Sequence, residues 1–120
     1  MRRLFESFGH ALAGCAEAFS SQRNFRVHAG FAVAALALGV LLGLSPLEWL
    51  VLAITIALVL STEMVNTSLE ALVDLVSPEV HDKARVAKDV AAGAVLLMAL
   101  LSIIVGLVLF LPKLSLLRGA

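Results

Sequence analysis

Five residues with oxygen-bearing side chains lie between positions 63 and 74 of a long apolar stretch. They are Glu63, Asn66, Thr67, Glu70 and Asp74. At 100° per residue they cover an arc of about 100° on an α-helix, so all five share one face over about three turns. Ionisable side chains beside an apolar span are costly, and they normally face a bundle interior, a cavity or a partner charge. The spacing therefore predicts one polar face on a long apolar helix.

This polar face has groups that a phosphoryl transferase needs. Mg²⁺ prefers hard oxygen ligands and usually binds through one or two carboxylates together with substrate phosphates. Lys88 and the adjacent Asp89 are expected at a depth in the membrane comparable to that of the polar face. Lys88 could neutralise phosphate charge, and a carboxylate of the polar face could accept a proton from an attacking hydroxyl. Residue types alone leave two other interpretations open, a structural polar seam paired with Lys88 and a pathway for cations or protons.

The composition places most of the chain in a membrane. Hydrophobic residues make up 61% of the 120 residues, more than a soluble domain of this length can bury. Nine Lys and Arg residues balance nine Asp and Glu residues, so no net charge attracts nucleic acid. The single Cys15 excludes an internal disulfide. The first apolar run begins only after Arg26, which argues against a cleavable signal peptide.

We expect an all-α membrane protein with one domain over residues 1–120, built from a surface helix and three transmembrane helices. Residues 1–23 are predicted to form an amphipathic helix that lies on the membrane, packs against the bundle, or does both. The first span covers residues 27–44, close to the minimum length for crossing a bilayer. Ser45, Pro46 and Glu48 predict a capping box that starts a second helix over residues 46–76, long enough to continue into the cytoplasm. The third span covers residues 84–111 and is expected to stop at Pro112.

The distribution of positive charge predicts the orientation. Positive residues occur before the first span and after the second, at Arg2, Arg3, Arg23, Arg26, Lys83, Arg85 and Lys88. The turn around Pro46 has none. The positive-inside rule therefore places the N-terminus and the second loop in the cytoplasm and the Pro46 turn outside. Lys113 and Arg118 then fall outside, against the rule.

Two motifs resemble the signature of the bacterial diacylglycerol kinase and undecaprenol kinase family. They are Glu63-Met-Val-Asn66-Thr67-Ser-Leu-Glu70-Ala-Leu-Val-Asp74 and Ala87-Lys88-Asp89-Val-Ala-Ala-Gly93-Ala-Val95. The resemblance extends over nearly the whole chain. The second motif and the segment Asn24-Phe25-Arg26-Val27-His28 are more similar to the Gram-positive undecaprenol kinase branch than to the proteobacterial branch.

The resemblance implies a homotrimeric lipid kinase of the bacterial inner membrane that uses ATP and Mg²⁺, with sites shared between neighbouring subunits. Glu63 corresponds to the catalytic base, Asn66 to a residue that positions groups beside it, and Glu70 to a metal-binding carboxylate. Nucleotide contacts are implied for His10, Gln22, Glu79, Val80, His81, Lys88 and Asp89. Arg3 and the apolar face of the surface helix would lie near the lipid.

Position 22 departs from the family pattern. Where the family usually has a second metal-binding glutamate just before the Phe25-Arg26 pair, this chain has Gln22. An amide offers Mg²⁺ a neutral oxygen but no charge, so we expect weaker metal binding unless Asp74 or Asp89 compensates. Undecaprenol, giving undecaprenyl phosphate, is the expected substrate. The alternatives are diacylglycerol, giving phosphatidic acid, and a lipid-binding homologue with weakened or absent turnover.

Overall fold

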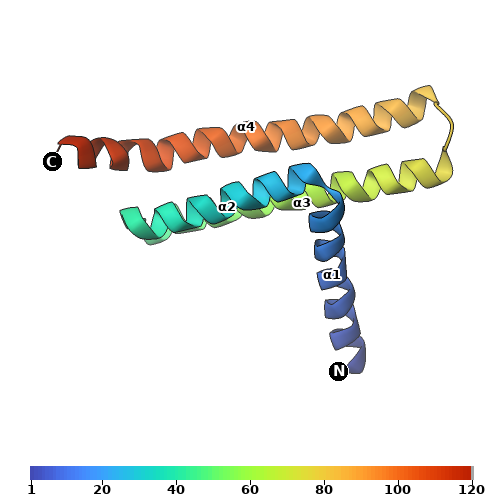
Figure 1. Ribbon diagram of the computed structural model, residues 1–120, viewed down its shortest axis with the longest axis horizontal. Coiled ribbons are helices and arrows are strands. Elements are labelled where there is room, and N and C mark those ends of the chain that lie inside the picture. Colours follow the sequence, from blue (N-terminus) through green and yellow to red (C-terminus); the bar gives the residue numbers. More distant parts are fainter. Residues whose placement is uncertain (120) are drawn as a thin grey trace.

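The computed structural model describes residues 1–119, and over this range it contains four α-helices and no strand. The helices are α1 (Arg2–Ser21), α2 (Arg23–Leu42), α3 (Pro46–Val76) and α4 (Asp82–Gly119). Figure 1 shows α2, α3 and α4 running alongside one another, with α1 projecting away from them at the start of α2. The last three helices are long and apolar enough to cross a membrane. The all-α membrane fold with one N-terminal helix and three candidate spans is therefore confirmed.

The helix α1 is amphipathic, and the rest of the chain leaves its apolar face open. Leu4 and Phe8 are 57% and 62% exposed, as expected of a helix whose apolar face enters the membrane interface. At the other end of α1, Arg26 donates hydrogen bonds from Nη1 to the carbonyl oxygens of Phe19 and Ser20, both at 2.9 Å. A helix end leaves such carbonyls without partners, so Arg26 stabilises the corner between α1 and α2.

The boundaries of the first two helices differ from the predicted ones. Gln22 is extended, with φ −111° and ψ 111°, and it alone separates α1 from α2. The helix α2 therefore begins at Arg23, four residues before the predicted start. It ends at Leu42 because Gly43 adopts the left-handed conformation, with φ 72°, which terminates helices and suits glycine.

The turn between α2 and α3 has the predicted capping box. The Ser45 Oγ accepts a hydrogen bond from the Glu48 backbone N–H at 3.2 Å, and the Glu48 Oε1 accepts one from the Ser45 N–H at 3.0 Å. Just before this turn, a Cβ on Gly39 would lie 2.8 Å from Cη2 of Trp49. Only glycine therefore allows the indole of α3 to pack this closely on α2.

The expectation that the helix of the third span stops at Pro112 is wrong, because α4 continues as a helix to Gly119. Proline removes one backbone hydrogen bond, and membrane helices tolerate this loss where neighbouring groups compensate. Beyond Pro112, the Lys113 Nζ lies 3.1 Å from Glu48 Oε1, an ion pair that joins the end of α4 to the start of α3. The first residue of α4 is Asp82, two residues before the predicted start.

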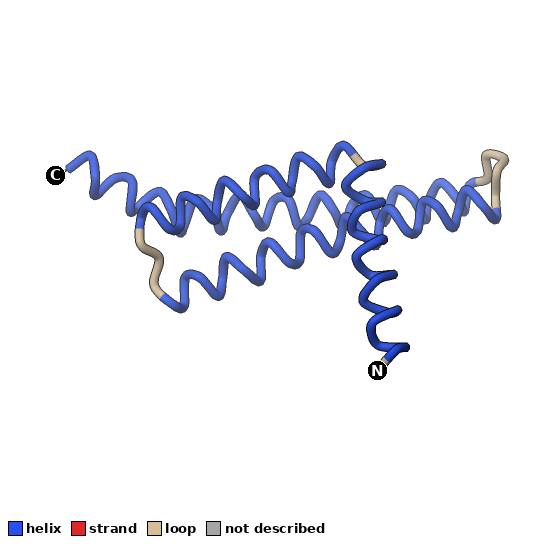
Figure 2. The backbone as a smooth tube through the Cα atoms, turned by 60° about the horizontal axis from the view of Figure 1, so that its bottom comes forward, coloured by secondary structure: helices blue, strands red, loops and turns tan. Residues whose placement is uncertain are grey.

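The packed core and the polar residues occupy different parts of the bundle. The buried cluster of Leu44, Leu52, Leu109 and Phe110 lies at the end where α2 turns into α3. At the opposite end α3 and α4 continue past the level of α1 to the loop that joins them, as both views of the backbone show (Figures 1 and 2). Glu63, Glu70 and Asp74, in the second half of α3, therefore lie near or beyond the level at which α1 joins the bundle.

Candidate active site

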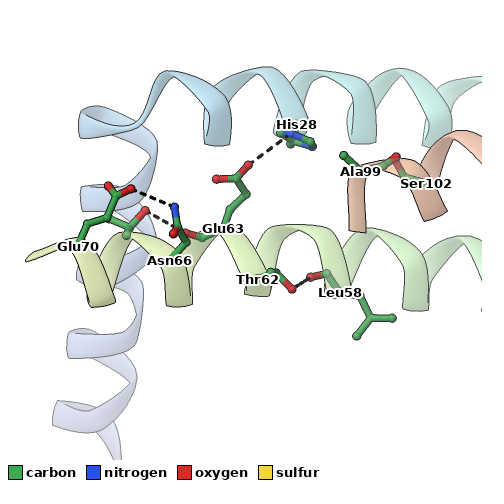
Figure 3. Close-up of polar contacts among 9 residues, drawn as sticks. His28, Leu58, Thr62, Glu63, Asn66, Glu70, Ala99 and Ser102 are labelled. Atoms are coloured by element: carbon green, nitrogen blue, oxygen red, sulfur yellow. Dashed lines mark hydrogen bonds and ion pairs between the residues drawn. The ribbon is translucent and has the colours of Figure 1, made fainter. Parts of the chain in front are cut away.

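Glu63 is the one buried carboxylate among residues 1–119, with an exposed fraction of 3%. Its Oε1 lies 3.4 Å from Nε2 of His28, which projects from α2 (Figure 3). The contact is within ion-pair distance but does not have hydrogen-bond geometry, and within the described chain Oε1 has no hydrogen-bond partner. A buried acceptor left without a partner costs about 1–3 kcal/mol. The Glu63 carboxylate therefore has an unused hydrogen-bonding capacity, and the nearest side-chain donor is His28.

The next turns of α3 carry Asn66 and Glu70 on the same face as Glu63 (Figure 3). Asn66 Nδ2 donates to Glu70 Oε1 at 3.4 Å, while the buried Asn66 Oδ1 has no hydrogen-bond partner in the described chain. Thr67 donates to the backbone carbonyl of Glu63 at 2.9 Å, so its hydroxyl is satisfied within the helix. The polar face thus presents two buried oxygens without hydrogen-bond partners, one on Glu63 and one on Asn66.

An ion pair connects the two sequence motifs across α3 and α4. Lys88 donates from Nζ to Oδ1 of Asp74, and both side chains are partly exposed. Asp89 instead pairs with Arg85, one turn earlier on α4, at 3.2 Å. The structure therefore places Lys88 beside the polar face of α3, whereas Asp89 is engaged on its own helix.

The remaining predicted nucleotide contacts are spread over two places. His10 is exposed on α1, and Gln22 is the half-buried corner residue. Glu79, Val80 and His81 lie in the exposed loop before α4, where the His81 Nδ1 accepts a hydrogen bond from the Lys83 N–H at 3.1 Å. Residues 1–119 contain no group of three or more His, Cys, Asp or Glu side chains arranged to hold a metal ion. A metal here would need oxygens from amides or from substrate phosphates as further ligands.

An apolar groove of about 480 Å³ lies between α2, α3 and α4. It begins at His28 and extends to Phe110. Besides His28, two polar residues line it, but Thr55 donates to the Val51 carbonyl at 2.8 Å and Ser102 to the Ala99 carbonyl at 2.7 Å. Because those hydroxyls are satisfied within their own helices, the groove offers an apolar wall along most of its length, with His28 at one end.

Sequence reasoning missed the contact between His28 and Glu63. From the sequence alone, the position of His28 at the start of an apolar run indicates an interfacial polar residue at a helix entrance, or one beside a lipid headgroup. An ionisable residue at the start of an apolar run is a signal for function, but helical periodicity within α2 says nothing about which residue of α3 it faces. That pairing depends on how the two helices pack.

Comparisons with known proteins identify the family of this chain. Residues 9–110 match the family model described as prokaryotic diacylglycerol kinase. The chain is 45% identical to an undecaprenol kinase of Bacillus subtilis over 95% of its own length and 93% of that protein. It is 48% identical to a diacylglycerol kinase of Synechocystis over 92% of its length and 64% of that protein. A diacylglycerol kinase of Escherichia coli is 26% identical over 85% of this chain and 84% of its own length. The chain therefore belongs to the prokaryotic diacylglycerol kinase family of membrane lipid kinases.

Proposed function

We propose that this enzyme transfers the γ-phosphate of ATP to the hydroxyl of undecaprenol at the cytoplasmic face of the bacterial inner membrane. Diacylglycerol is the alternative acceptor. The observation that carries the proposal is the position of Glu63, a buried carboxylate whose histidine contact forms one end of an apolar groove. A lipid alcohol has the matching shape, with one polar end and a long apolar chain.

In this proposal Glu63 is the catalytic base. The lipid chain lies in the groove, and its hydroxyl reaches the Glu63 carboxylate, which takes the hydroxyl proton as the oxygen attacks the γ-phosphorus. A new phosphorus–oxygen bond forms to the lipid, and the bond between the γ-phosphorus and the oxygen that bridges it to ADP breaks. Confinement in the membrane holds the headgroup at a nearly constant depth, which lowers the entropic cost of bringing the reactants together. Asn66, one turn further along α3, positions groups through its buried amide oxygen.

In this proposal the nucleotide binds at the end of the bundle where a loop joins α3 to α4. Lys88 supplies positive charge for the phosphates there, and the loop of Glu79, Val80 and His81 contacts the nucleotide. Asp89 on α4 and His10 on α1 are further contacts in this proposal.

Glu70 fits a magnesium site in this region. Its carboxylate and the nearby Asn66 amide are hard oxygen donors, and Mg²⁺ usually needs only one or two carboxylates when phosphates supply other ligands. In this proposal Glu70 and Gln22 hold the ion. When bound, Mg²⁺ would neutralise the charge of the transferring phosphate.

Replacing Gln22 with Glu should raise the apparent affinity for Mg²⁺, because a carboxylate adds a charge that the amide lacks. The measurement is the initial rate as a function of free Mg²⁺ at saturating ATP. Ser21→Glu is the matched control, since it adds the same charge one residue away on an exposed position of α1 and should leave the Mg²⁺ dependence unchanged. An unchanged Mg²⁺ dependence for Gln22→Glu would show that position 22 is not a ligand.

The proposed assembly is a homotrimer with its N-terminus in the cytoplasm. Large apolar side chains are exposed on every helix of the single chain, a surface that lipid and neighbouring subunits would share. The exposed side chains of Asp74, Arg85 and Asp89 leave the nucleotide end open to a neighbouring subunit, consistent with a shared site.

The substrate is tested by measuring kcat/KM for undecaprenol and for diacylglycerol in the same detergent micelles. The proposal expects the higher value for undecaprenol. This expectation is supported by the similarity to the Bacillus subtilis enzyme over nearly the full length of both chains. A higher value for diacylglycerol would replace undecaprenol by the alternative substrate and keep the kinase. Binding of either lipid without phosphate transfer would favour the non-catalytic homologue.

A further inference from the structure

The proposed function makes Glu63 the base but leaves open what holds its carboxylate in a productive orientation. We propose that His28 is the positioning residue for Glu63, and that it also forms the wall of the lipid groove next to the reacting hydroxyl. This inference rests on the proposed function. It assigns a role in the reaction to a residue of α2, outside both sequence motifs.

The contacts around Glu63 single out His28. Within residues 1–119, the His28 Nε2 is the one basic group within 4 Å of the Glu63 carboxylate. The neighbouring Thr67 contacts only the backbone carbonyl of Glu63, and Asn66 contacts Glu70. Both partners are sheltered, with side-chain exposures of 22% for His28 and 4% for Glu63. Among the described residues, His28 is therefore the side chain best placed to orient this carboxylate.

The chemistry of imidazole suits this task. A histidine with its proton on Nε2 donates a hydrogen bond from that atom. Directed at the Glu63 Oε1, this bond would orient the carboxylate and leave Oε2 to accept the proton of the lipid hydroxyl. Hydrogen bonds of active sites are often long before substrate binds and shorten in the reacting complex, so a distance of 3.4 Å is compatible with this role.

The groove gives His28 its second role. The same imidazole that contacts Glu63 also lines the head of the groove between α2, α3 and α4. A lipid chain in the groove would therefore pass this ring on its way to the carboxylate. His28 thus couples the position of the chain to the position of the base.

A purely structural role, in which His28 only links α2 to α3, makes different predictions. Three variants separate the two roles. His28→Phe keeps a planar ring but removes the donor. His28→Gln places an amide N–H near the position of Nε2, and His28→Asn carries an amide that is too short to reach it.

If His28 positions the base, His28→Phe and His28→Asn should lower kcat by about 10–100-fold, the size found for hydrogen-bonding partners that orient reactive groups. The KM for ATP should stay unchanged, and His28→Gln should retain most of kcat. Thr62→Val is the matched control, because the Thr62 hydroxyl donates only to the Leu58 carbonyl at 2.7 Å and points away from Glu63 (Figure 3). Thermal unfolding in detergent checks that each variant is folded. If His28→Phe does not fold, the kcat of His28→Asn provides the test.

The controls separate this inference from the proposed function. Full kcat in folded His28→Phe or His28→Asn would overturn the inference, and so would an equal loss in His28→Gln. If Glu63→Gln loses turnover while the His28 variants do not, only the role of His28 fails. If Glu63→Gln keeps its full rate, the proposed base itself fails. In the double variant, His28→Phe should cause no further loss beyond Glu63→Gln alone, because a positioning residue acts through the base.

Discussion

Replacing Glu63 with Gln is expected to lower kcat for lipid phosphorylation by about 10²–10⁴-fold, the usual contribution of a general base. Glutamine keeps the size of the side chain and fits the same buried position on α3. It cannot accept the hydroxyl proton, so only the proton transfer is removed. The measurement is steady-state turnover with undecaprenol, ATP and Mg²⁺ in detergent micelles.

Nucleotide binding should survive this substitution. Glu63 is buried against His28, whereas most of the proposed nucleotide contacts lie in the loop after α3 and on α4. The Kd for a non-hydrolysable ATP analogue should therefore match that of the unsubstituted enzyme. Thr62→Val, one residue away on α3, should keep its turnover. A Glu63→Gln enzyme with full kcat would show that another group takes the proton.

Replacing Lys88 with Met should raise the KM for ATP by about tenfold or more, because a charge-assisted contact to phosphate is lost. The substitution keeps an unbranched side chain but removes the charge that now pairs with Asp74. Lys88→Arg, which retains the charge, should be affected less. The KM for the lipid should change little, since the lipid groove lies on the other side of Glu63.

Lys113→Met is the matched control for Lys88→Met. It makes the same chemical change on the same helix, at the opposite end, where Lys113 pairs with Glu48. It should reduce thermal stability without raising the KM for ATP. Equal ATP KM values for Lys88→Met and the unsubstituted enzyme would remove Lys88 from the nucleotide site.

Local sequence rules predicted much of the framework. The 100° advance per residue placed Glu63, Asn66 and Glu70 on one face, because that relation depends only on helix geometry within α3. The start of α3 followed from Ser45 and Glu48, whose capping contacts span three residues. Such features need no knowledge of how the helices pack against one another.

Features that depend on packing between helices were harder to predict from the sequence. Local rules predict that Pro112 ends a helix, but α4 continues beyond it. The next residue, Lys113, forms an ion pair with Glu48 on α3. The contact between His28 and Glu63 joins residues 35 positions apart, and no periodicity within one helix relates them. The possible pairing of Lys88 with an acid of α3 was foreseen, but its choice of Asp74 depends on how α3 packs against α4.

The metal site illustrates a different difficulty. The resemblance implied Glu70 and Gln22 as ligands, yet a single chain shows no group of acidic or histidine side chains gathered for a metal anywhere in residues 1–119. Ligands that come from ATP, or from a neighbouring subunit, leave no spacing pattern in one sequence. The roles of Glu70 and Gln22 therefore stay predictions for the Mg²⁺ titration to test.

The most direct test of lipid kinase activity is transfer of label from γ-³²P-ATP to undecaprenol by the purified, folded enzyme. We expect labelled undecaprenyl phosphate to accumulate with Mg²⁺ present, and to disappear when Mg²⁺ is chelated or Glu63 is replaced by Gln. Absence of labelled product from undecaprenol and from diacylglycerol, in protein shown to be folded and supplied with Mg²⁺, would contradict the proposed reaction.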